Sequence, residues 1–525
     1  TNALNLMDLA GMPIRSVERD ISYPLVVAGG HACYNPEPMA PFIDVFVIGE
    51  GEEALLKIIG VMRAARHLDR ETQLRYVAQI EGCYVPRFYD VAYHADGTVQ
   101  SITPNVPEAP AKVLKTIVAQ MPPPVTVFII PFVELVHNRA PIEIMRGCTR
   151  GCRFCHAGMV TRPVRERPVA EVLQAMEDIL ESTGYEEIAL LSLSSSDYTN
   201  VLELTEKIGQ RFGHLGLNIS LPSLRIESVS TQLMDNLGDS RKSGFTLAPE
   251  AATEKMRNTI NKFVSHEELL ETAREIYRRD WRTIKLYFMI GHPMEELEDV
   301  QAIIDLSKAV LAEGRRFHGK KASVNVGVST FIPKPHTPFQ WEAMDETDKI
   351  YEKINLLKGQ VRGDGLRLRW NNPRESLFEG YLSRGDRRVA EVVGRAWANG
   401  AKFDAWGEHF KEATWLEAFA AEGLDPTFFT HRKRTIDEIF PWEHIDIAVT
   451  KKFLTQDYLM SQAQETRVDC RNHCFACGIL PKLKDLRRET PDEAWECPPV
   501  SQRRAGAREP RVPIVEGIPL VVLGG

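Results

Sequence analysis

Long apolar runs are missing from this chain of 525 residues, and so is an excess of positive charge. No apolar stretch approaches the roughly 20 residues that a helix needs to cross a bilayer. The first residues also lack the charged start, apolar core and cleavage pattern of a signal peptide. A net charge of −8 argues against attraction of the whole protein to nucleic acid. We therefore expect a globular, cytoplasmic protein.

Cysteine is scarce, and its placement excludes a disulfide framework. The chain has nine cysteines, an odd number, arranged as two triplets plus Cys33, Cys83 and Cys497. Such spacing is typical of metal sites. No Ser/His/Asp or paired-carboxylate signature of acid–base catalysis is visible either. The chemistry is therefore expected at the cysteines.

The first triplet follows a short apolar stretch that ends at Gly147. Cys148, Cys152 and Cys155 form a C-x3-C-x2-C pattern. Three thiolates on one loop can hold three irons of a cubane cluster and leave the fourth iron without a protein ligand. A structural zinc site usually has four ligands and fits one loop of three poorly. The pattern predicts an iron–sulfur cluster, with zinc or inert thiols as the alternatives.

The sequence around and after the first triplet resembles that of the radical SAM superfamily. The matching stretches are RGCTRGCRFC, RPVRER, LLSLSSSDY, LPSLR, TLAPEA, KLYFMIG and FIPKPHTPFQW, spread over roughly residues 20 to 480. They are most similar to a branch fused to an N-terminal cobalamin-binding-like domain. The resemblance implies a [4Fe-4S] cluster whose open iron is chelated by S-adenosyl-L-methionine (SAM). It also implies reductive cleavage of SAM to a 5′-deoxyadenosyl radical, with a small reductant protein such as flavodoxin or ferredoxin as partner.

Strands and helices alternate after Pro141, which predicts a parallel sheet with crossover helices. The resemblance implies the fold, an α/β partial (βα)6 TIM-type barrel, with six strands counting the one that precedes the cysteines. The other five are expected at 188–193, 217–221, 244–247, 283–290 and 324–332, and helices at 169–182, 200–212, 267–279 and 297–311.

Five regions are predicted around this core. Residues 1–80 resemble part of a Rossmann-like, cobalamin-binding-like domain, and residues 81–139 form a hairpin and a Pro-rich linker. Residues 140–343 are the radical SAM core, 344–465 a mostly helical region, and 466–525 a Cys-rich segment with a basic tail. No D-x-H-x-x-G motif occurs in the first region, so cobalamin binding is doubtful.

Working residues of such barrels lie where the strands end. The resemblance assigns cofactor contacts to Ser194, Ser195 and Ser196 after the second strand, at the turn that binds the methionyl amine in relatives. Capping of the helix near Asn200 is the alternative role of these serines, and it can coexist with binding. Ser223 and Arg225 follow the third strand. Arg225 is suited to a carboxylate because of its planar fork, and a structural ion pair is the alternative.

Three more candidates surround the expected adenosine. Glu250 ends the fourth strand and suits a ribose hydroxyl, unless it caps the following helix. Gly291 ends the fifth strand, where the backbone can lie against adenine, and Phe154 suits an adenine contact. Lys334 and His336 follow the sixth strand and are expected to face the substrate end, with their roles open. His156 is not expected to bind iron.

The second triplet, Cys470, Cys474 and Cys477, repeats the C-x3-C-x2-C spacing. No SAM-binding strand ends follow it, so we expect an auxiliary iron–sulfur cluster or a zinc site, with free thiols as the alternative. Cys497 or His473 is a possible fourth ligand.

Two functions remain open on the sequence. The first is a radical SAM enzyme that activates a C–H bond of an unknown substrate, a small molecule, RNA or protein, for example by methylation or thiolation. The second is a non-catalytic scaffold or sensor that holds iron–sulfur clusters or zinc.

Overall fold

Parallel strands form the centre of the computed structural model, which describes residues 1–490 except 134, 222–225, 227–232, 234–243 and 263, together with 495, 497 and 498. One sheet has the order β11-β10-β7 and another the order β12-β13-β14-β15, and every neighbouring pair in the two sheets is parallel. Their bounds are β7 (Ala140–Glu143), β10 (Glu187–Leu191), β11 (Asn218–Ser220), β12 (Phe245–Glu250), β13 (Thr283–Ile290), β14 (Ser323–Thr330) and β15 (Leu366–Trp370).

The strands follow the predicted order, and each expected strand is present. Their side chains alternate between buried and partly exposed along β12, β13 and β14, as half-buried strands require. The strand β15 is an addition, because residues 344–465 were expected to be mostly helical. Its sequence Leu-Arg-Leu-Arg-Trp alternates with the period of a strand, and it extends the second sheet beside β14.

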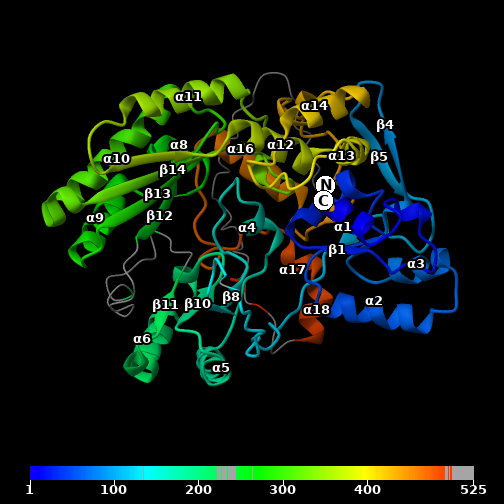
Figure 1. The fold of residues 1–525 in the computed structure, drawn as a ribbon, viewed down its shortest axis with the longest axis horizontal. Helices are drawn as coiled ribbons and strands as arrows, with labels where there is room; N and C mark the ends of the chain where they lie inside the picture. The colour runs from blue at the N-terminus through cyan, green and yellow to red at the C-terminus, as the bar shows by residue number, and fades with distance from the viewer. Residues whose placement is uncertain are drawn as a thin grey trace, which may run out of the picture.

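Helices cover these sheets on the outside (Figure 1). In α5 (Val169–Ser182), Val172, Met176 and Ile179 recur on one face and are buried against β7 and β10, as the helical period predicts. The other core helices are α6 (Val201–Phe212), α8 (Glu254–Thr259), α9 (His266–Arg278), α10 (Leu297–His318) and α11 (Thr347–Gln360).

The N-terminal region is a small α/β unit. Its sheet has β1 (Val27–Gly29) parallel to β2 (Val45–Val47), with β3 (Cys83–Tyr84) antiparallel to β2. The predicted hairpin is present as β4 (Tyr89–Tyr93) and β5 (Val99–Pro104). The helices here are α1 (Asn2–Leu9), α2 (Glu52–Ala64) and α3 (Arg70–Ala78).

The C-terminal region is mainly helical. It contains α12 (Pro373–Arg384), α13 (Val389–Ala398), α14 (Glu412–Ala421), α15 (Pro426–Thr430), α16 (Lys451–Gln462), α17 (Ile479–Lys482) and α18 (Lys484–Glu489). A short strand, β16 (Ile445–Asp446), pairs with β6 (Val113–Leu114) of the linker. None of the helices described is long and apolar enough to span a bilayer.

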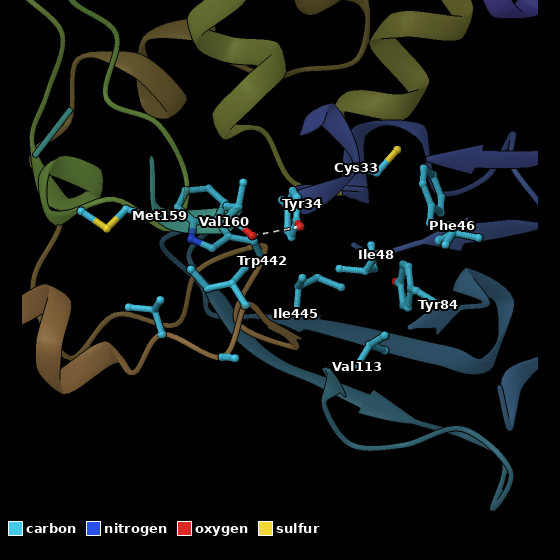
Figure 2. Close-up of a cluster of buried hydrophobic side chains, with 14 of the residues drawn as sticks. Cys33, Tyr34, Phe46, Ile48, Tyr84, Val113, Met159, Val160, Trp442 and Ile445 are labelled. Carbon is cyan, nitrogen blue, oxygen red and sulfur yellow. Dashed lines mark hydrogen bonds between the residues drawn. The ribbon is translucent and has the colours of Figure 1, made fainter. Parts of the chain in front are cut away.

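One hydrophobic core joins segments that are far apart in the sequence (Figure 2). Tyr34 from the N-terminal region packs with Val160, at the end of the short helix after the first cysteine triplet, and with Trp442 and Ile445 from the C-terminal region. The Tyr34 hydroxyl donates a hydrogen bond to the Val160 carbonyl oxygen at 3.3 Å. Buried side chains therefore hold the segment after the first triplet in place.

Candidate cluster and cofactor site

The first cysteine loop is closed by a short antiparallel ladder. The strand β8 (Met145–Arg146) enters the loop and pairs with β9 (Arg165–Glu166), which leaves it. Between them, Gly147 has φ +84°, and a Cβ atom there would lie 2.7 Å from the Pro163 carbonyl oxygen. Only glycine tolerates that combination without a shift of the backbone. The chain thus turns sharply just before Cys148.

The three thiols of this loop lie close together. The Cys155 backbone N–H donates to the Cys152 carbonyl oxygen at 3.1 Å, and the Cys155 sulfur accepts from the Gly158 N–H at 3.3 Å, which caps α4 (His156–Val160). Burial, with the nearby Cys152 and Cys148, raises the pKa of the Cys155 thiol to about 12. A bound metal cation would offset both burial and the repulsion between neighbouring thiolates, because metals bind the thiolate form.

Buried polar contacts brace the loop from behind. The Arg153 guanidinium is fully buried and donates to the carbonyl oxygens of Asn258 and Thr259, both at 2.9 Å. The Asn261 amide donates to the Gly151 carbonyl oxygen at 3.0 Å and accepts from the Arg467 N–H at 2.7 Å. These contacts fix the loop against the turn after α8, and the sequence patterns did not reveal them.

A cavity of about 740 Å³ opens beside the loop. Cys148 lines it, as do all three cysteines of the second triplet and Cys497. Its lining is also rich in arginine: Arg150, Arg162, Arg165, Arg467 and Arg471. The volume lies in the usual range of ligand sites.

Burial distinguishes the three arginines after the first loop from a solvated basic run. Arg162, Arg165 and Arg167 are 6%, 5% and 3% exposed. Arg165 forms a bidentate ion pair with Glu50, at 2.6 and 2.8 Å, and Glu50 thereby ties the N-terminal region to the loop. Basic residues near the cysteines are therefore structural parts of the site.

The serine turn after β10 lies next to the first loop. The Ser194 hydroxyl donates to Asp197 at 2.6 Å, and the same carboxylate accepts from Arg150 of the cysteine loop at 2.6 Å. The Ser195 hydroxyl donates to the Leu190 carbonyl oxygen at 3.1 Å, and Ser196 is buried beside it. No side chain caps the start of α6 in the structure, so helix capping does not explain these serines.

A second group of predicted residues lies on the other side of the loop. The Phe154 ring lies 6.3 Å from the ring of His292, the residue after Gly291. Glu250 pairs with Lys262 at 3.2 Å, and Lys262 lies near Cys155. Thr253, rather than Glu250, caps α8.

Glu250 and Gly291 share an unusual backbone at the end of their strands. Glu250 has φ 65° and Gly291 has φ +87°. A non-glycine residue in the left-handed region costs roughly 1 kcal/mol, so the surrounding structure must hold Glu250 there. Neither residue lines the cavity of Cys148. Ser223 and Arg225 lie outside the described residues.

Three further residues face away from the cavity. Burial lowers the pKa of His156 to about 3, and its ring packs against those of Tyr34 and His31. The imidazole of His336 is buried, with Nε2 2.9 Å from the Tyr34 carbonyl oxygen. Lys334 forms an ion pair with Glu379. None of the three is a lining residue, so the expectation that Lys334 and His336 face a substrate is not met in this cavity.

A single zinc ion and a cubane cluster require different spacings of their thiol ligands. A tetrahedral zinc ion with Zn–S bonds of about 2.3 Å brings its sulfur ligands within about 4 Å of one another. In a cubane each thiolate binds a different iron, so the sulfurs lie farther apart. Among the described residues, no three His, Cys, Asp or Glu side chains are arranged to hold one metal ion.

Comparison with known families decides what the first loop belongs to. The model of the radical SAM superfamily matches residues 142–307, which contain the whole first triplet, and a model for the N-terminal part of radical SAM proteins matches residues 1–86. The chain therefore contains a radical SAM domain. Radical SAM enzymes use a [4Fe-4S] cluster and SAM, and the matched stretch of this radical SAM enzyme contains the three cysteines of the first triplet.

Relatives of this radical SAM enzyme have different functions. An uncharacterised protein of Methanocaldococcus jannaschii, MJ0966, is 28% identical over 384 residues, which cover 72% of this chain and 75% of that protein. The ribosomal protein uS12 methylthiotransferase RimO of Acidothermus cellulolyticus is 27% identical over 42% of this chain. The tRNA-2-methylthio-N(6)-dimethylallyladenosine synthase of Thermodesulfovibrio yellowstonii is 25% identical over 50%. The chain spans 48% and 59% of these two enzymes.

Among solved structures, the radical SAM methyltransferase TsrM from Kitasatospora setae, with tryptophan and a SAM analogue, has a TM-score of 0.42 and 14% identity. The match covers 89% of this chain and 82% of TsrM. The cobalamin-dependent SAM radical enzyme OxsB has a TM-score of 0.38 and 11% identity, over 89% of this chain and 68% of OxsB.

Proposed function

We propose that this radical SAM enzyme activates an unactivated C–H bond of a substrate bound in the cavity beside Cys148. Cys148, Cys152 and Cys155 are the ligands of the [4Fe-4S] cluster in this proposal. The bound cluster would supply the electron for cleavage of SAM to methionine and a 5′-deoxyadenosyl radical that could remove hydrogen from the substrate. The electron comes from a small flavodoxin- or ferredoxin-like reductant. The observation that carries the proposal is the matched loop with three neighbouring thiols, of which that of Cys148 lines the cavity.

The chain's own residues position SAM and exclude water from the reacting atoms. We assign Ser194, Ser195 and Ser196 to the methionyl amine, because Asp197 links their turn to Arg150 of the cluster loop. We assign Ser223 and Arg225 to the methionyl carboxylate, because they follow β11 in the sequence.

Phe154, Glu250 and Gly291 are assigned to the adenosine. Support comes from their common location on the Cys155 side of the loop. The proposal includes the finer fold, a six-stranded partial barrel made by β7, β10, β11, β12, β13 and β14. Glu250 lies at the carboxyl end of β12, and Gly291 lies just after that of β13.

The proposed substrate is RNA or a protein, in keeping with the tRNA and ribosomal-protein relatives. Four of the five arginines that line the cavity already pair with carboxylates, and these are Arg150, Arg165, Arg467 and Arg471. Thiolation or methylation is the proposed outcome, in keeping with the methylthiotransferase and the tRNA-2-methylthio synthase among the relatives. Retention on immobilised RNA should fall steeply between 50 and roughly 200 mM salt. Salt-insensitive binding to a protein, with no retention on RNA, would instead favour a protein substrate.

The enzymatic step is tested with the full chain after anaerobic reconstitution with iron and sulfide. With SAM and dithionite, the wild type should form 5′-deoxyadenosine. The Cys152→Ala variant should lose this product, and Cys83→Ala, a buried cysteine remote from the cavity, should keep it. A reconstituted wild type that leaves SAM intact contradicts the proposal and favours the scaffold function.

A further inference from the structure

The second cysteine triplet is held directly against the first loop. The Cys470 backbone N–H donates to the Thr149 carbonyl oxygen at 3.1 Å, and the Thr149 hydroxyl donates to the Asp469 carboxylate at 2.7 Å. Arg150 adds an ion pair with Asp469 at 3.3 Å. The two loops thus form a pair of neighbouring walls on one cavity.

The loop of the second triplet has a shaped backbone of its own. Gly478, directly after Cys477, has φ +118°, and a Cβ atom there would lie 2.8 Å from the Ala448 carbonyl oxygen. The Thr450 N–H donates to the Cys477 carbonyl oxygen at 2.8 Å and secures the end of the loop on the start of α16. Like Gly147 before the first triplet, Gly478 allows a sharp turn where only glycine fits.

A fourth cysteine reaches the same place from beyond α18. Cys497 lines the cavity and interacts electrostatically with Cys474 and Cys477. Trp495, only 4% exposed, packs into the large core and fixes the chain two residues before Cys497. His473 is not a lining residue, and its ring lies 4.7 Å from that of Phe475. Cys497 is therefore the better fourth ligand.

A buried cation faces these sulfurs. The Arg162 guanidinium donates hydrogen bonds to the Gly158 carbonyl oxygen at 3.1 Å and to the sulfur of Cys477. Its other electrostatic partners include Cys470 and Cys148. In the part of the chain that the structure describes, no ion pair joins Arg162 to a carboxylate.

An arginine buried without an anion is costly, by several kcal/mol. Neutral thiols would leave the charge of Arg162 uncompensated. A group ligated by four thiolates carries negative charge and would balance it. The buried arginine between the two triplets is thus an independent sign that an anionic centre occupies the second one.

We propose that Cys470, Cys474, Cys477 and Cys497 hold a second iron–sulfur cluster on the wall of the cavity that faces Cys148, with Arg162 between the two centres. The ligand class is a cubane cluster, because the second triplet repeats the C-x3-C-x2-C spacing of the first loop and Cys497 adds a fourth thiol beside it. The substrate then binds in a cavity bordered by two clusters.

Iron and sulfide analysis of the reconstituted full chain tests this site separately from SAM cleavage. The wild type should bind about eight irons, and the combined Cys470→Ala, Cys474→Ala and Cys477→Ala variant about four. The matching variant of Cys148, Cys152 and Cys155 should also retain about four. Cys33→Ala, a buried cysteine outside the cavity, should retain about eight. Far-ultraviolet circular dichroism checks that each variant is folded.

A second pair of variants tests the ligand set with a readout that does not depend on complete loss of the site. Cys497→Ala should yield a [3Fe-4S] signal in electron paramagnetic resonance after mild oxidation, whereas His473→Ala should behave like the wild type. Three results would overturn the proposal: about four irons in the wild type, stoichiometric zinc at the second triplet, or a second-triplet variant with undiminished iron. If His473→Ala lost the electron paramagnetic resonance signal of the second cluster and Cys497→Ala kept it, the assignment of Cys497 as the fourth ligand would be overturned.

Discussion

The Thr149 hydroxyl donates a hydrogen bond to the Asp469 carboxylate at 2.7 Å, although the two residues are 320 positions apart in the sequence. Thr149 directly follows the first cysteine of the first loop, and Asp469 directly precedes the first cysteine of the second. This bond and the neighbouring backbone bond from Cys470 join the two loops at equivalent points. The C-terminal segment is therefore part of the site.

Replacement of Thr149 by valine removes that bond while the shape of the side chain is kept. A hydrogen bond of this kind contributes about 1 kcal/mol, which corresponds to roughly a fivefold change in an equilibrium constant. Iron should therefore be lost to a chelator several times faster in Thr149→Val than in the wild type. Thr98→Val, at the exposed hairpin turn, removes a similar bond far from the cavity and should lose iron at the wild-type rate.

Arg162 should govern the charge balance of the second site. Arg162→Met removes the buried cation, and we expect the second centre to become harder to reduce and to lose its iron more readily, because loss of one buried charge costs roughly 3–5 kcal/mol. Arg162→Lys keeps the charge and should be intermediate. Redox titration followed by electron paramagnetic resonance measures the effect.

The exposed Arg315→Met is the matched control for Arg162 and should leave the potentials unchanged. Equal midpoint potentials for Arg162→Met and the wild type would refute the assigned role of this guanidinium.

Asp197 links the serine turn to the first loop, so its charge should matter for SAM. In Asp197→Asn, both Arg150 and the Ser194 hydroxyl lose a charged acceptor at 2.6 Å. A charge-assisted bond is worth roughly 1.5–3 kcal/mol, so the Kd for SAM should rise about tenfold or more. Calorimetry on the reconstituted protein measures this. Asp305→Asn, on the exposed side of α10, should bind SAM normally.

Stability should depend on pH through His336. Burial lowers its pKa from 6.5 to about 4. Between these pH values His336 is protonated in the unfolded chain and neutral in the folded protein. The free energy of unfolding therefore falls as pH decreases from about 6.5 to about 4, and the contribution of His336 stays constant below pH 4. The contribution is on the order of 3 kcal/mol.

The unfolding midpoint of apo His336→Gln should therefore fall less between pH 7 and pH 5 than that of the wild type. His67→Gln, at an exposed position, should show the wild-type dependence. A His336→Gln protein as acid-sensitive as the wild type would show that this imidazole is not responsible.

Local patterns predicted the helices and parallel strands well. The predicted helix over residues 169–182 matches α5 at both ends, because a regular apolar stripe and the flanking Pro168 mark it. The parallel order of the strands could also be predicted, since alternating strands and helices permit few topologies. The sequence argument missed β15, because it lies beyond the six strands of the expected barrel.

Contacts between distant segments were not predictable in this way. Burial of Arg162 and Arg165 depends on the second cysteine loop and on Glu50, both remote in sequence, and a run of arginines by itself is typical of a solvated surface. The junction of Thr149 with Asp469 likewise leaves no local pattern. The two triplets were visible as motifs, but only the structure places them on one cavity.

The central claim is that one iron of the cluster held by Cys148, Cys152 and Cys155 stays open to SAM. The most direct test is electron paramagnetic resonance of the dithionite-reduced protein before and after addition of SAM, with the second triplet replaced by alanine so that one cluster contributes. The account predicts a [4Fe-4S]⁺ signal whose g values shift when SAM is added. A signal that SAM leaves unchanged, or a reduced protein without any cluster signal, would contradict it.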